Sequence, residues 1–490
     1  MSEIHVETRS GAYRDSVSLL EVSRAVAQTP GVQDAIVAMG TPLNLDLMRE
    51  LGFVIDAPSA NDLIIAIRAI NKSQIEAALA AMANEFDAID RRARASSGGG
   101  EIASARSVGR AHDANLALIS VPGSGAFAEA VDALESGQSV MLFSDNVPVW
   151  QEILLKDLAS SLDLLVMGPD CGTAVINGVG LGFANVVTPG PIGIVAASGT
   201  GAQHVMCLLD QAGVGVTNCV GVGGRDLSSS VQGRSTISAL NALSEDRRTK
   251  AIVLVSKPPA PEVAQMIRKH ASTLTKPVIF ALLGQGLPDL TSATEDILNT
   301  IGTPVPKWKS WGHAPLKKHP GFLRGLYSGG TVCDEAMVIA SRELGPIYSN
   351  IPLNPSWHHD PFSSSRENTF IDFGDDAMTV GRAHPMIDPT LRIERLRKES
   401  VDPECGVIIM DVVLGHGADP NPAASLAPAI KETISAHGIP VVIALIGATG
   451  DPQGLERQAD LLSEAGAYVT VSNAAAIRKA ISLIELSEAS

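Results

Sequence analysis

The stretch Ile192-Gly-Ile-Val-Ala-Ala-Ser-Gly-Thr-Gly-Ala202 indicates the fold of this chain more clearly than any other. It opens with an apolar run of the length of a buried strand, and small, turn-forming residues follow. A helical pattern then covers residues 202–212. A buried strand that enters a helix through a glycine turn is typical of a parallel α/β sheet.

The turn of Ser198, Gly199, Thr200 and Gly201 is also the first candidate site. Glycines let its backbone N–H groups converge, and the helix dipole adds about half a positive charge there. Such a turn binds phosphate or carboxylate, but it lacks the pattern of an NAD-binding turn and the lysine of a P-loop. The alternative is an ordinary tight turn with a hydroxyl cap. His204, one turn later, either touches the bound anion or is an ordinary core or surface histidine.

Strand and helix patterns alternate along the rest of the chain and predict an α/β protein with several doubly wound, Rossmann- or flavodoxin-like parallel sheets. Residues 1–92 have the order β-α-β-α-β-α, which predicts a small α+β domain with its helices on one face. Residues 90–100 are polar and glycine-rich and are expected to be a linker. The expected domains are this small one at 1–92, a Rossmann-like CoA-binding-type domain at 113–187, and flavodoxin-like ligase domains at 188–305 and 324–490.

Composition and charge narrow the classes of partner. The chain has 490 residues, 45% of them hydrophobic, and a formal net charge of −16. Such an acidic chain repels a phosphodiester backbone, so we expect no nucleic acid. The basic, aromatic segment at 302–322 is expected to pack on a neighbouring domain instead. Small anionic metabolites remain suitable ligands, because a local helix N-terminus outweighs a distant net charge.

Cysteine spacing and hydropathy bear on the compartment. The five cysteines are widely spaced without a CxxC pair, which indicates reduced thiols rather than disulfides or zinc ligands. No apolar run approaches the ~18 residues of a membrane span, and the first residues do not resemble a signal peptide. We therefore expect a cytoplasmic protein that has no membrane partner and no metal site. GxSxG, HExxH and P-loop motifs are absent from the sequence, so a hydrolase, zinc enzyme or P-loop kinase is unsupported.

Further candidate residues follow other predicted strands. Asp170 lies in Gly168-Pro-Asp-Cys-Gly172, where it either lines the same crevice or only shapes a turn. Gly223, Gly224 and Arg225 precede Asp226, and an arginine there could hold a carboxylate or phosphate with two hydrogen bonds. A surface ion pair between Arg225 and Asp226 is the alternative.

The last domain contributes two more candidates. A proline-stiffened loop carries Arg382 and His384, more polar equipment than a connector needs, although internal ion pairs are the alternative. Gly415, His416 and Gly417 lead from a strand toward the helix expected at 425–436. They resemble the turn at 198–201, and two opposed helix ends of this kind would hold one anion from both sides.

Several of these motifs resemble the α-subunit of succinyl-CoA synthetase, and the chain as a whole resembles the FdrA family of predicted acyl-CoA synthetases. The synthetase-like motifs are Met167-Gly-Pro-Asp-Cys-Gly-Thr173, Gly193-Ile-Val-Ala-Ala-Ser-Gly-Thr200 and Val220-Gly-Val-Gly-Gly224. The FdrA-type motifs are Asp15-Ser-Val-Ser-Leu-Leu20, Met39-Gly-Thr-Pro42, Phe143-Ser-Asp-Asn-Val147, Gly223-Gly-Arg-Asp-Leu227, Ser256-Lys-Pro-Pro259 and Gly381-Arg-Ala-His-Pro-Met-Ile-Asp-Pro-Thr390.

The resemblance implies a function as well as a fold. FdrA-type proteins look like one subunit of a multi-subunit oxamate carbamoyltransferase of allantoin or purine catabolism, which uses carbamoyl phosphate. The resemblance thus implies co-encoded partner subunits, leaves homodimerisation open, and assigns Arg225 or Arg382 to the carboxylate and His384 to acid–base catalysis. An NDP-forming acyl-CoA synthetase, with CoA as ligand, is the alternative, and a non-catalytic scaffold is the third. The synthetases' phosphorylated histidine has no counterpart in Leu283-Gly-Gln-Gly-Leu-Pro-Asp-Leu290.

Overall fold

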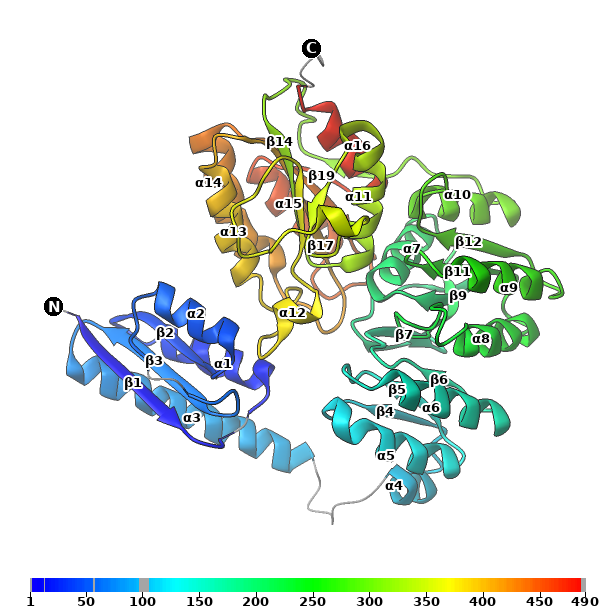
Figure 1. Cartoon of the computed structure of the whole chain (residues 1–490), viewed down its shortest axis with the longest axis horizontal. Coiled ribbons are helices and arrows are strands. Elements are labelled where there is room, and N and C mark those ends of the chain that lie inside the picture. Colours follow the sequence, from blue (N-terminus) through cyan, green and yellow to red (C-terminus); the bar gives the residue numbers. More distant parts are fainter. Residues whose placement is uncertain (1, 13, 56–57, 97–104, 486–490) are drawn as a thin grey trace. The chain divides into compact units, whose positions relative to one another are not determined.

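The computed structural model describes residues 2–12, 14–55, 58–96 and 105–485, and the chain divides into two compact units. The N-terminal unit combines residues 1–102 with the distant segment 374–388. The main unit comprises residues 103–373 and 389–490. The chain is a mixed α/β protein with parallel Rossmann-like sheets and a small antiparallel N-terminal sheet, as the sequence predicts (Figure 1).

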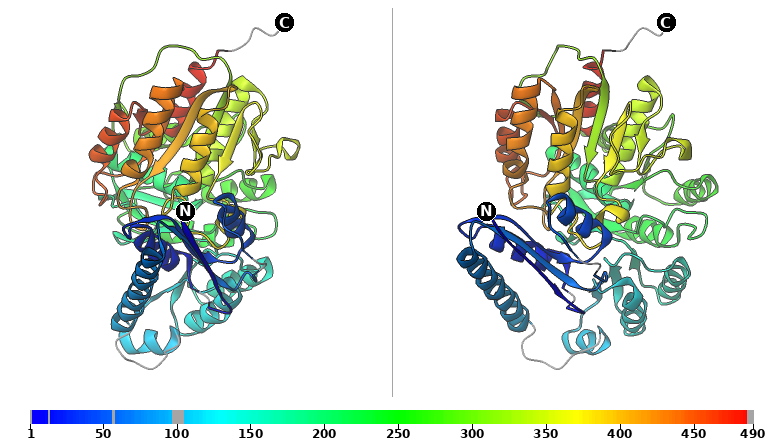
Figure 2. Two further views of the ribbon diagram at one scale, coloured as in Figure 1. Left: turned by 90° about the vertical axis from the view of Figure 1, so that its left-hand side faces the viewer. Right: turned by 60° about the vertical axis from the view of Figure 1, so that its left-hand side comes forward.

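The N-terminal unit is a three-stranded antiparallel sheet in the order β1-β3-β2. Figure 2 shows the long helix α3 lying along this sheet. The elements of the unit are β1 (Glu3–Arg9), α1 (Ser16–Ala27), β2 (Val32–Met39), α2 (Pro42–Glu50), β3 (Leu63–Ala69), α3 (Lys72–Ser96) and the short α12 (Asp376–Thr379).

Two expectations for this unit are wrong. Helices cover both faces of the sheet: α1 and α3 pack on one face, whereas α2 packs on the other. The reason lies in β3, whose Ile65 and Ile67 face α1 and α3 while Ile64 and Ala66 face α2. The expected linker at 90–100 is also partly helical, because α3 continues to Ser96. The rest of that linker lies outside the described residues.

The main unit begins with a three-stranded parallel sheet in the order β4-β5-β6. Its apolar core joins alanines and leucines of the flanking helices to Val140 and Leu142 of the central strand. The elements are α4 (Ala105–His112), β4 (Leu116–Ile119), α5 (Gly123–Glu135), β5 (Ser139–Leu142), α6 (Val149–Ser161) and β6 (Val166–Met167).

The second sheet of the main unit contains the stretch from Ile192 to Ala202. Its four parallel strands have the order β12-β11-β9-β10, and an antiparallel hairpin, β7-β8, extends the β10 edge. This hairpin is not among the strands expected from the sequence. The elements are β7 (Thr173–Ile176), β8 (Val179–Gly182), β9 (Pro189–Ala197), α7 (Gly199–Gln211), β10 (Val216–Gly221), α8 (Arg234–Glu245), β11 (Ala251–Ser256), α9 (Pro261–Ala271), β12 (Val278–Leu282) and α10 (Leu290–Thr300).

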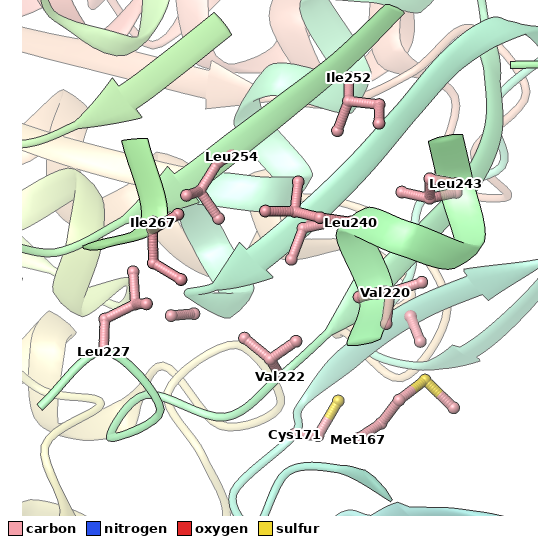
Figure 3. Close-up of a cluster of buried hydrophobic side chains, with 14 of the residues drawn as sticks. Met167, Cys171, Val220, Val222, Leu227, Leu240, Leu243, Ile252, Leu254 and Ile267 are labelled. Carbon is pink, nitrogen blue, oxygen red and sulfur yellow. The ribbon is translucent and has the colours of Figure 1, made fainter. Parts of the chain in front are cut away.

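A buried apolar cluster fixes this sheet against α8 and α9, and it reaches the end of β6. Figure 3 shows the side chains that converge there, namely Met167, Cys171, Val220, Val222, Leu227, Leu240, Leu243, Ile252, Leu254 and Ile267. Because α7 and α10 contact each other and the sheet as well, the strands are covered on both faces. This burial explains why β9 and β11 read as continuous apolar runs.

The third sheet has seven strands in the order β13-β19-β18-β17-β14-β16-β15. Without the two-residue edge strand β15, its parallel strands follow the flavodoxin-like order 2-1-3-4-5 in chain order, and the second sheet follows the same order for four strands. The elements are β13 (Ser310–Trp311), β14 (Phe322–Tyr327), α11 (Gly330–Leu344), β15 (Tyr348–Ser349), a 3-10 turn (Pro355–Trp357), β16 (Thr369–Asp372), α13 (Thr390–Ser400), β17 (Cys405–Val413), α14 (Pro422–His437), β18 (Val441–Ile446), α15 (Leu455–Glu464), β19 (Tyr468–Thr470) and α16 (Asn473–Ser482).

The basic, aromatic connector packs against its neighbours in the main unit. Trp308 donates from its indole N–H to Glu295 of α10, at 2.8 Å. Lys309 and Trp311 both donate to Glu456 of α15, and β13 joins the edge of the third sheet. The connector therefore ties α10 to the third sheet.

The free cysteines agree with the reduced thiols that the sequence predicts. All five cysteines are free thiols and buried. Within the described parts of the chain, no helix is long and apolar enough to cross a bilayer.

Candidate functional site

The turn after β9 sits at the carboxyl edge of the second sheet. Ser198 caps α7: its hydroxyl accepts a hydrogen bond from the Gly201 amide at 3.0 Å. The same hydroxyl donates to Thr331 Oγ1 at 2.7 Å. Because strand order reverses between β9 and β11, this edge is the topological switch point at which open α/β sheets bind their ligands.

The start of α11 lies directly against this turn, and Figure 1 shows α7 and α11 as neighbours. A methyl group added at Gly329 would lie 2.7 Å from the side chain of Thr200, and one added at Gly201 would lie 2.9 Å from Thr331. The N-cap residue of α11 is Gly329, and no side chain caps the helix. Two helix N-termini, one from each duplicated sheet, therefore meet in the main unit.

The prediction of a second helix start at residues 415–417 is wrong. Gly415, His416 and Gly417 do not lead straight into a helix, because α14 begins at Pro422 behind the N-cap residue Asn421. Instead, the His416 amide donates to the Ala184 carbonyl at 2.8 Å, and Gly417 lies against Phe183. These glycines permit close backbone packing on the segment after β8.

Lys257, which follows β11, lies beside the two helix starts. A methyl group added at Gly330 would lie 3.0 Å from Lys257 Nζ and 2.7 Å from Asp372 Oδ2, so a side chain here would displace at least one of these two groups. The Lys257 ammonium also lies 3.7 Å from Asp334 Oδ2, one turn into α11, and its side chain is 44% exposed. A cation and two carboxylates thus surround the uncapped start of α11.

Electrostatics give the members of this cluster different protonation behaviour. Burial opposes the charge of Lys257, but the carboxylates of Asp334 and Asp372 outweigh it and hold the ammonium pKa above its usual value. Burial raises the pKa of Asp334 to about 6, although Lys257 opposes the rise. Near neutral pH, Lys257 is therefore a fixed cation, whereas Asp334 is close to its own titration range.

Asp411, at the end of β17, holds the turn before α11. Its carboxylate accepts hydrogen bonds from the amides of Ser328 and Gly329 and from the Ser328 hydroxyl. The buried guanidinium of Arg392 donates to the same carboxylate at 2.9 Å. Burial raises the pKa of Asp411, and Arg392 opposes this shift. A carboxylate of the protein thus occupies the amides of this turn.

His204 lies in the core rather than at the turn. It is fully buried, and neither ring nitrogen has a hydrogen-bond partner among the residues that the structure describes. Burial lowers its pKa to about 4, although Asp289 opposes this shift, so the ring is neutral near pH 7. His204 is therefore an ordinary core histidine, which is one of the two alternatives that the sequence left open.

Arg225 serves a structural network in the main unit. Its guanidinium donates to the Val147 carbonyl at 2.8 Å and lies 3.0 Å from a carboxylate oxygen of Glu152. Asp226 is not its partner; it is buried and accepts from Lys156 at 2.7 Å. The alternative of a surface ion pair between Arg225 and Asp226 is therefore wrong, and Arg225 holds α6 against the second sheet.

The loops of Asp170, Gly223 and Gly224 do lie together. A methyl group added at Gly223 would be 2.4 Å from the Pro169 carbonyl oxygen, and one added at Gly224 would be 3.9 Å from Asp170 Oδ2. Gly223 also has a φ of +88°, which side chains rarely adopt. These glycines permit close packing of two strand ends, and Asp170 adds negative charge near Lys257.

Arg382 and His384 belong to the N-terminal unit. Their loop packs on the start of α2, where Asn44 donates to the Gly381 carbonyl at 3.0 Å. Arg382 lies 3.9 Å from Asp388, and His384 Nδ1 accepts a hydrogen bond from the Met386 amide at 3.3 Å. Two motifs that carry the FdrA-type resemblance, at 39–42 and 381–390, thus meet, and the catalytic roles assigned to Arg382 and His384 stay predictions.

Three residues of the cluster are absent from the sequence-based candidates: Lys257, Asp334 and Asp411. Lys257 carried a usable signal, since it directly follows an apolar strand pattern, at the end of the strand where parallel sheets bind ligands, and precedes two prolines. Asp411 carried a weaker one, because it interrupts an otherwise apolar strand. Asp334 had none, since a single carboxylate in a helix is unremarkable in sequence.

Comparison with known proteins places this site in a family. A chain from Escherichia coli strain K12, the uncharacterized protein YahF, is 38% identical, and the match covers 96% of each chain. The chain belongs to the same family as YahF. The family model for CoA-ligase matches residues 326–483, and the model described as AllF, heavy metal-associated domain, matches residues 1–103.

Succinate–CoA ligase subunits are more distant relatives. The mitochondrial alpha-2 subunit of Trichomonas vaginalis is 28% identical over 43% of this chain and 71% of its own length. The alpha subunit of Methanothermobacter thermautotrophicus is 28% identical over 36% of this chain and 59% of its own length. An FdrA-type, succinyl-CoA synthetase-like chain is thus confirmed.

The metal named in the AllF description does not fit the residues present. Residues 1–103 contain no cysteine, and His5 is their single histidine. In the described parts of the chain, no three histidine, cysteine, aspartate or glutamate side chains are grouped to hold a metal ion. Soft metals require thiolate or imidazole ligands, so this domain lacks the donors for them.

Proposed function

We propose that this chain is a subunit of a carbamoyltransferase complex, in which it binds the phosphate of carbamoyl phosphate where α7 and α11 meet. The observation that carries the proposal is the direct contact of the two helix starts, with Ser198 bonded to Thr331 and α11 uncapped. Two helix N-termini attract the same anion through their dipoles. They also stabilise charge that develops on a departing phosphate.

Family membership supports the reaction proposed. The N-terminal unit matches a model named for AllF, and the FdrA-type resemblance implies oxamate and oxalurate as the partners of carbamoyl phosphate. Transfer of a carbamoyl group from an acyl phosphate needs no phosphohistidine. This agrees with the sequence Leu283-Gly-Gln-Gly-Leu-Pro-Asp-Leu290, which contains no histidine.

A second function, acyl-CoA ligation, draws on the CoA-ligase model at 326–483 and on the succinate–CoA ligase relatives. It would use the same helix ends for an acyl phosphate and would place CoA on the main unit. This reaction needs a nucleotide-driven phosphorylation step. The missing histidine would then have to be supplied by a partner chain.

A phosphate-release assay separates these functions. The purified chain, alone and with its co-encoded partners, is offered carbamoyl phosphate plus oxamate, or ATP, CoA and succinate. We expect oxamate-dependent phosphate release from carbamoyl phosphate, and only in the presence of this chain. Phosphate release from ATP that requires CoA, or ³²P retained on protein histidine, would favour the ligase. Full activity of the partners without this chain would indicate a scaffold.

A further inference from the structure

Lys257 and Asp334 lie beside the proposed phosphate site, and the proposed function gives neither side chain a role. Lys257 leaves β11 at the point where strand order reverses, and Asp334 lies one turn into α11. These two elements come from different sheets, so their meeting follows from the contact between the duplicated halves. The switch point of a parallel sheet is where ligand-binding groups collect.

The space around Gly330 shows that this meeting is tight. A methyl group there would lie 3.0 Å from Lys257 Nζ and 2.7 Å from Asp372 Oδ2. The ammonium therefore lies against the backbone of the α11 start, where uncapped amides also point. A phosphate oxygen at this place would meet backbone N–H donors and a fixed cation together, a combination that binds phosphate strongly.

Asp334 is suited to a different task. Its carboxylate is buried, with a side chain 10% exposed, and its 3.7 Å separation from Lys257 is longer than a hydrogen bond. The cation supports the ionised form without occupying the carboxylate in a short bond. Since burial raises its pKa to about 6, the ionised form is a stronger base than an exposed aspartate and still predominates at pH 7.

We propose that Lys257 and Asp334 form the reacting pair of this site, with Lys257 binding the phosphate group and Asp334 acting as general base toward a nitrogen nucleophile. The nitrogen of an amide forms a bond to the carbamoyl carbon, and the bond from that carbon to the phosphate oxygen breaks. The proton lost by the nitrogen goes to Asp334, and inorganic phosphate leaves with the bonding pair. The ligand class is therefore an acyl phosphate together with an amide or amine that has an N–H to give.

This inference rests on the proposed function for its reaction, but its binding half can be tested alone. Titration calorimetry of the full chain with inorganic phosphate compares wild type with Lys257→Met and Lys257→Arg. Loss of one charged hydrogen bond should weaken binding by about tenfold or more for the methionine variant, with partial recovery for arginine. Lys250→Met is the matched control, because Lys250 is exposed and precedes the same strand at its opposite end.

The base is tested in the reconstituted complex. Asp334→Asn should lower kcat by about 10²- to 10⁴-fold, the usual contribution of a general base. In wild type, kcat/KM should fall as the pH drops below about 6, because Asp334 becomes protonated, and the variant should lose this limb. Besides Lys257 and Asp334 themselves, the charged groups near the pair are Asp372 at the end of β16 and Asp170 after β6, which both act on Lys257. Asp460→Asn, an exposed helix carboxylate, is the control.

The outcomes are distinguishable. If the wild-type complex releases no phosphate from carbamoyl phosphate, the proposed function fails, whatever the variants do. If wild type is active and Asp334→Asn keeps both its rate and its acid limb, the assignment of Asp334 is overturned. A His384→Asn variant that loses that limb instead would return the role to the loop at 381–390. Equal phosphate binding by wild type and Lys257→Met would overturn the assignment of Lys257.

Discussion

Two strand–turn–helix segments meet in the main unit. They have the same plan, but they differ in the charged groups that contact each turn. β9 enters α7 through Ser198, and β14 enters α11 through Ser328. Asp411 of β17 holds the turn between β14 and α11. Ser256 of β11 occupies the equivalent position beside the turn between β9 and α7. The duplicated halves therefore differ in which turn already carries an anion of the protein.

The helix that follows each turn is capped differently, and here α7 rather than α11 has the protein's own cap. Ser198 caps α7 with its own hydroxyl, but no side chain caps α11. In the β14–α11 segment Asp411 takes the amides of Ser328 and Gly329, which lie before the helix, and Lys257 approaches Gly330 at its first position. The two turns thus share one plan, but a side chain caps α7, whereas the start of α11 has Lys257 beside it instead.

The largest effect should come from Asp411→Asn. The change leaves the buried guanidinium of Arg392 without its counter-charge and weakens the hold on the Ser328 turn. We expect a loss of about 3–5 kcal/mol in the free energy of unfolding, as for other broken buried ion pairs. Urea unfolding followed by circular dichroism measures it. Ser256→Ala, at the equivalent position, should cost under about 1 kcal/mol. Equal losses for both variants would show that the charge of Asp411 does not distinguish the two turns.

An intermediate effect should follow from one added methyl group in each turn. Gly330→Ala would collide with Asp372 and Lys257, whereas Gly199→Ala would meet only Thr173 Oγ1, at 3.3 Å. Accommodating such a clash costs about 1–3 kcal/mol, and it would also displace Lys257 from the α11 start. We expect phosphate binding by calorimetry to weaken more for Gly330→Ala than for Gly199→Ala. The reverse order would assign the ligand to α7 rather than α11.

The smallest effect concerns the bond between the two turns. Ser198→Ala removes both the cap of α7 and the bond to Thr331, so the free energy of unfolding should fall by about 1–2 kcal/mol. Thr331→Val removes only the inter-turn bond and should cost about 0.5–1 kcal/mol. Differential unfolding of the two variants in urea tests this order. A larger loss for Thr331→Val would show that the contact, rather than the cap, stabilises the pair.

Local patterns predicted most of the elements, because burial on both faces of a parallel sheet leaves continuous apolar runs. The apolar run that begins at Ile192 lies within β9, and the helix expected at 425–436 lies within α14. The β7–β8 hairpin was not predicted, since its eight strand residues carry no strong alternation. The helix expected at 202–212 begins three residues earlier, because its first turn is made of the glycines read as a loop.

For the candidate site, the sequence correctly predicted the strand-to-helix turn at 198–201, whereas the second helix start that it predicted at 415–417 is wrong. Ser198 to Gly201 join a strand to a helix, and neighbouring residues along the chain are enough to predict such a turn, although Ser198, Thr200 and Gly201 are buried in the structure. Gly415 to Gly417 have the same composition, yet their contacts are with the segment at 183–185. Which of two similar glycine turns faces the first depends on how the sheets pack, and no local pattern records this.

The sequence by itself determined the strand–turn–helix units, their duplication and the family, because each depends on neighbouring residues along the chain. Only the tertiary structure decided that α11 meets α7, that Lys257 and Asp334 approach each other, and that His204 is a buried neutral ring. These facts depend on contacts between segments more than seventy residues apart, as between Lys257 and Asp334, or on burial by neighbouring helices. The charge state of such groups is set by what surrounds them, and the surroundings exist only after folding.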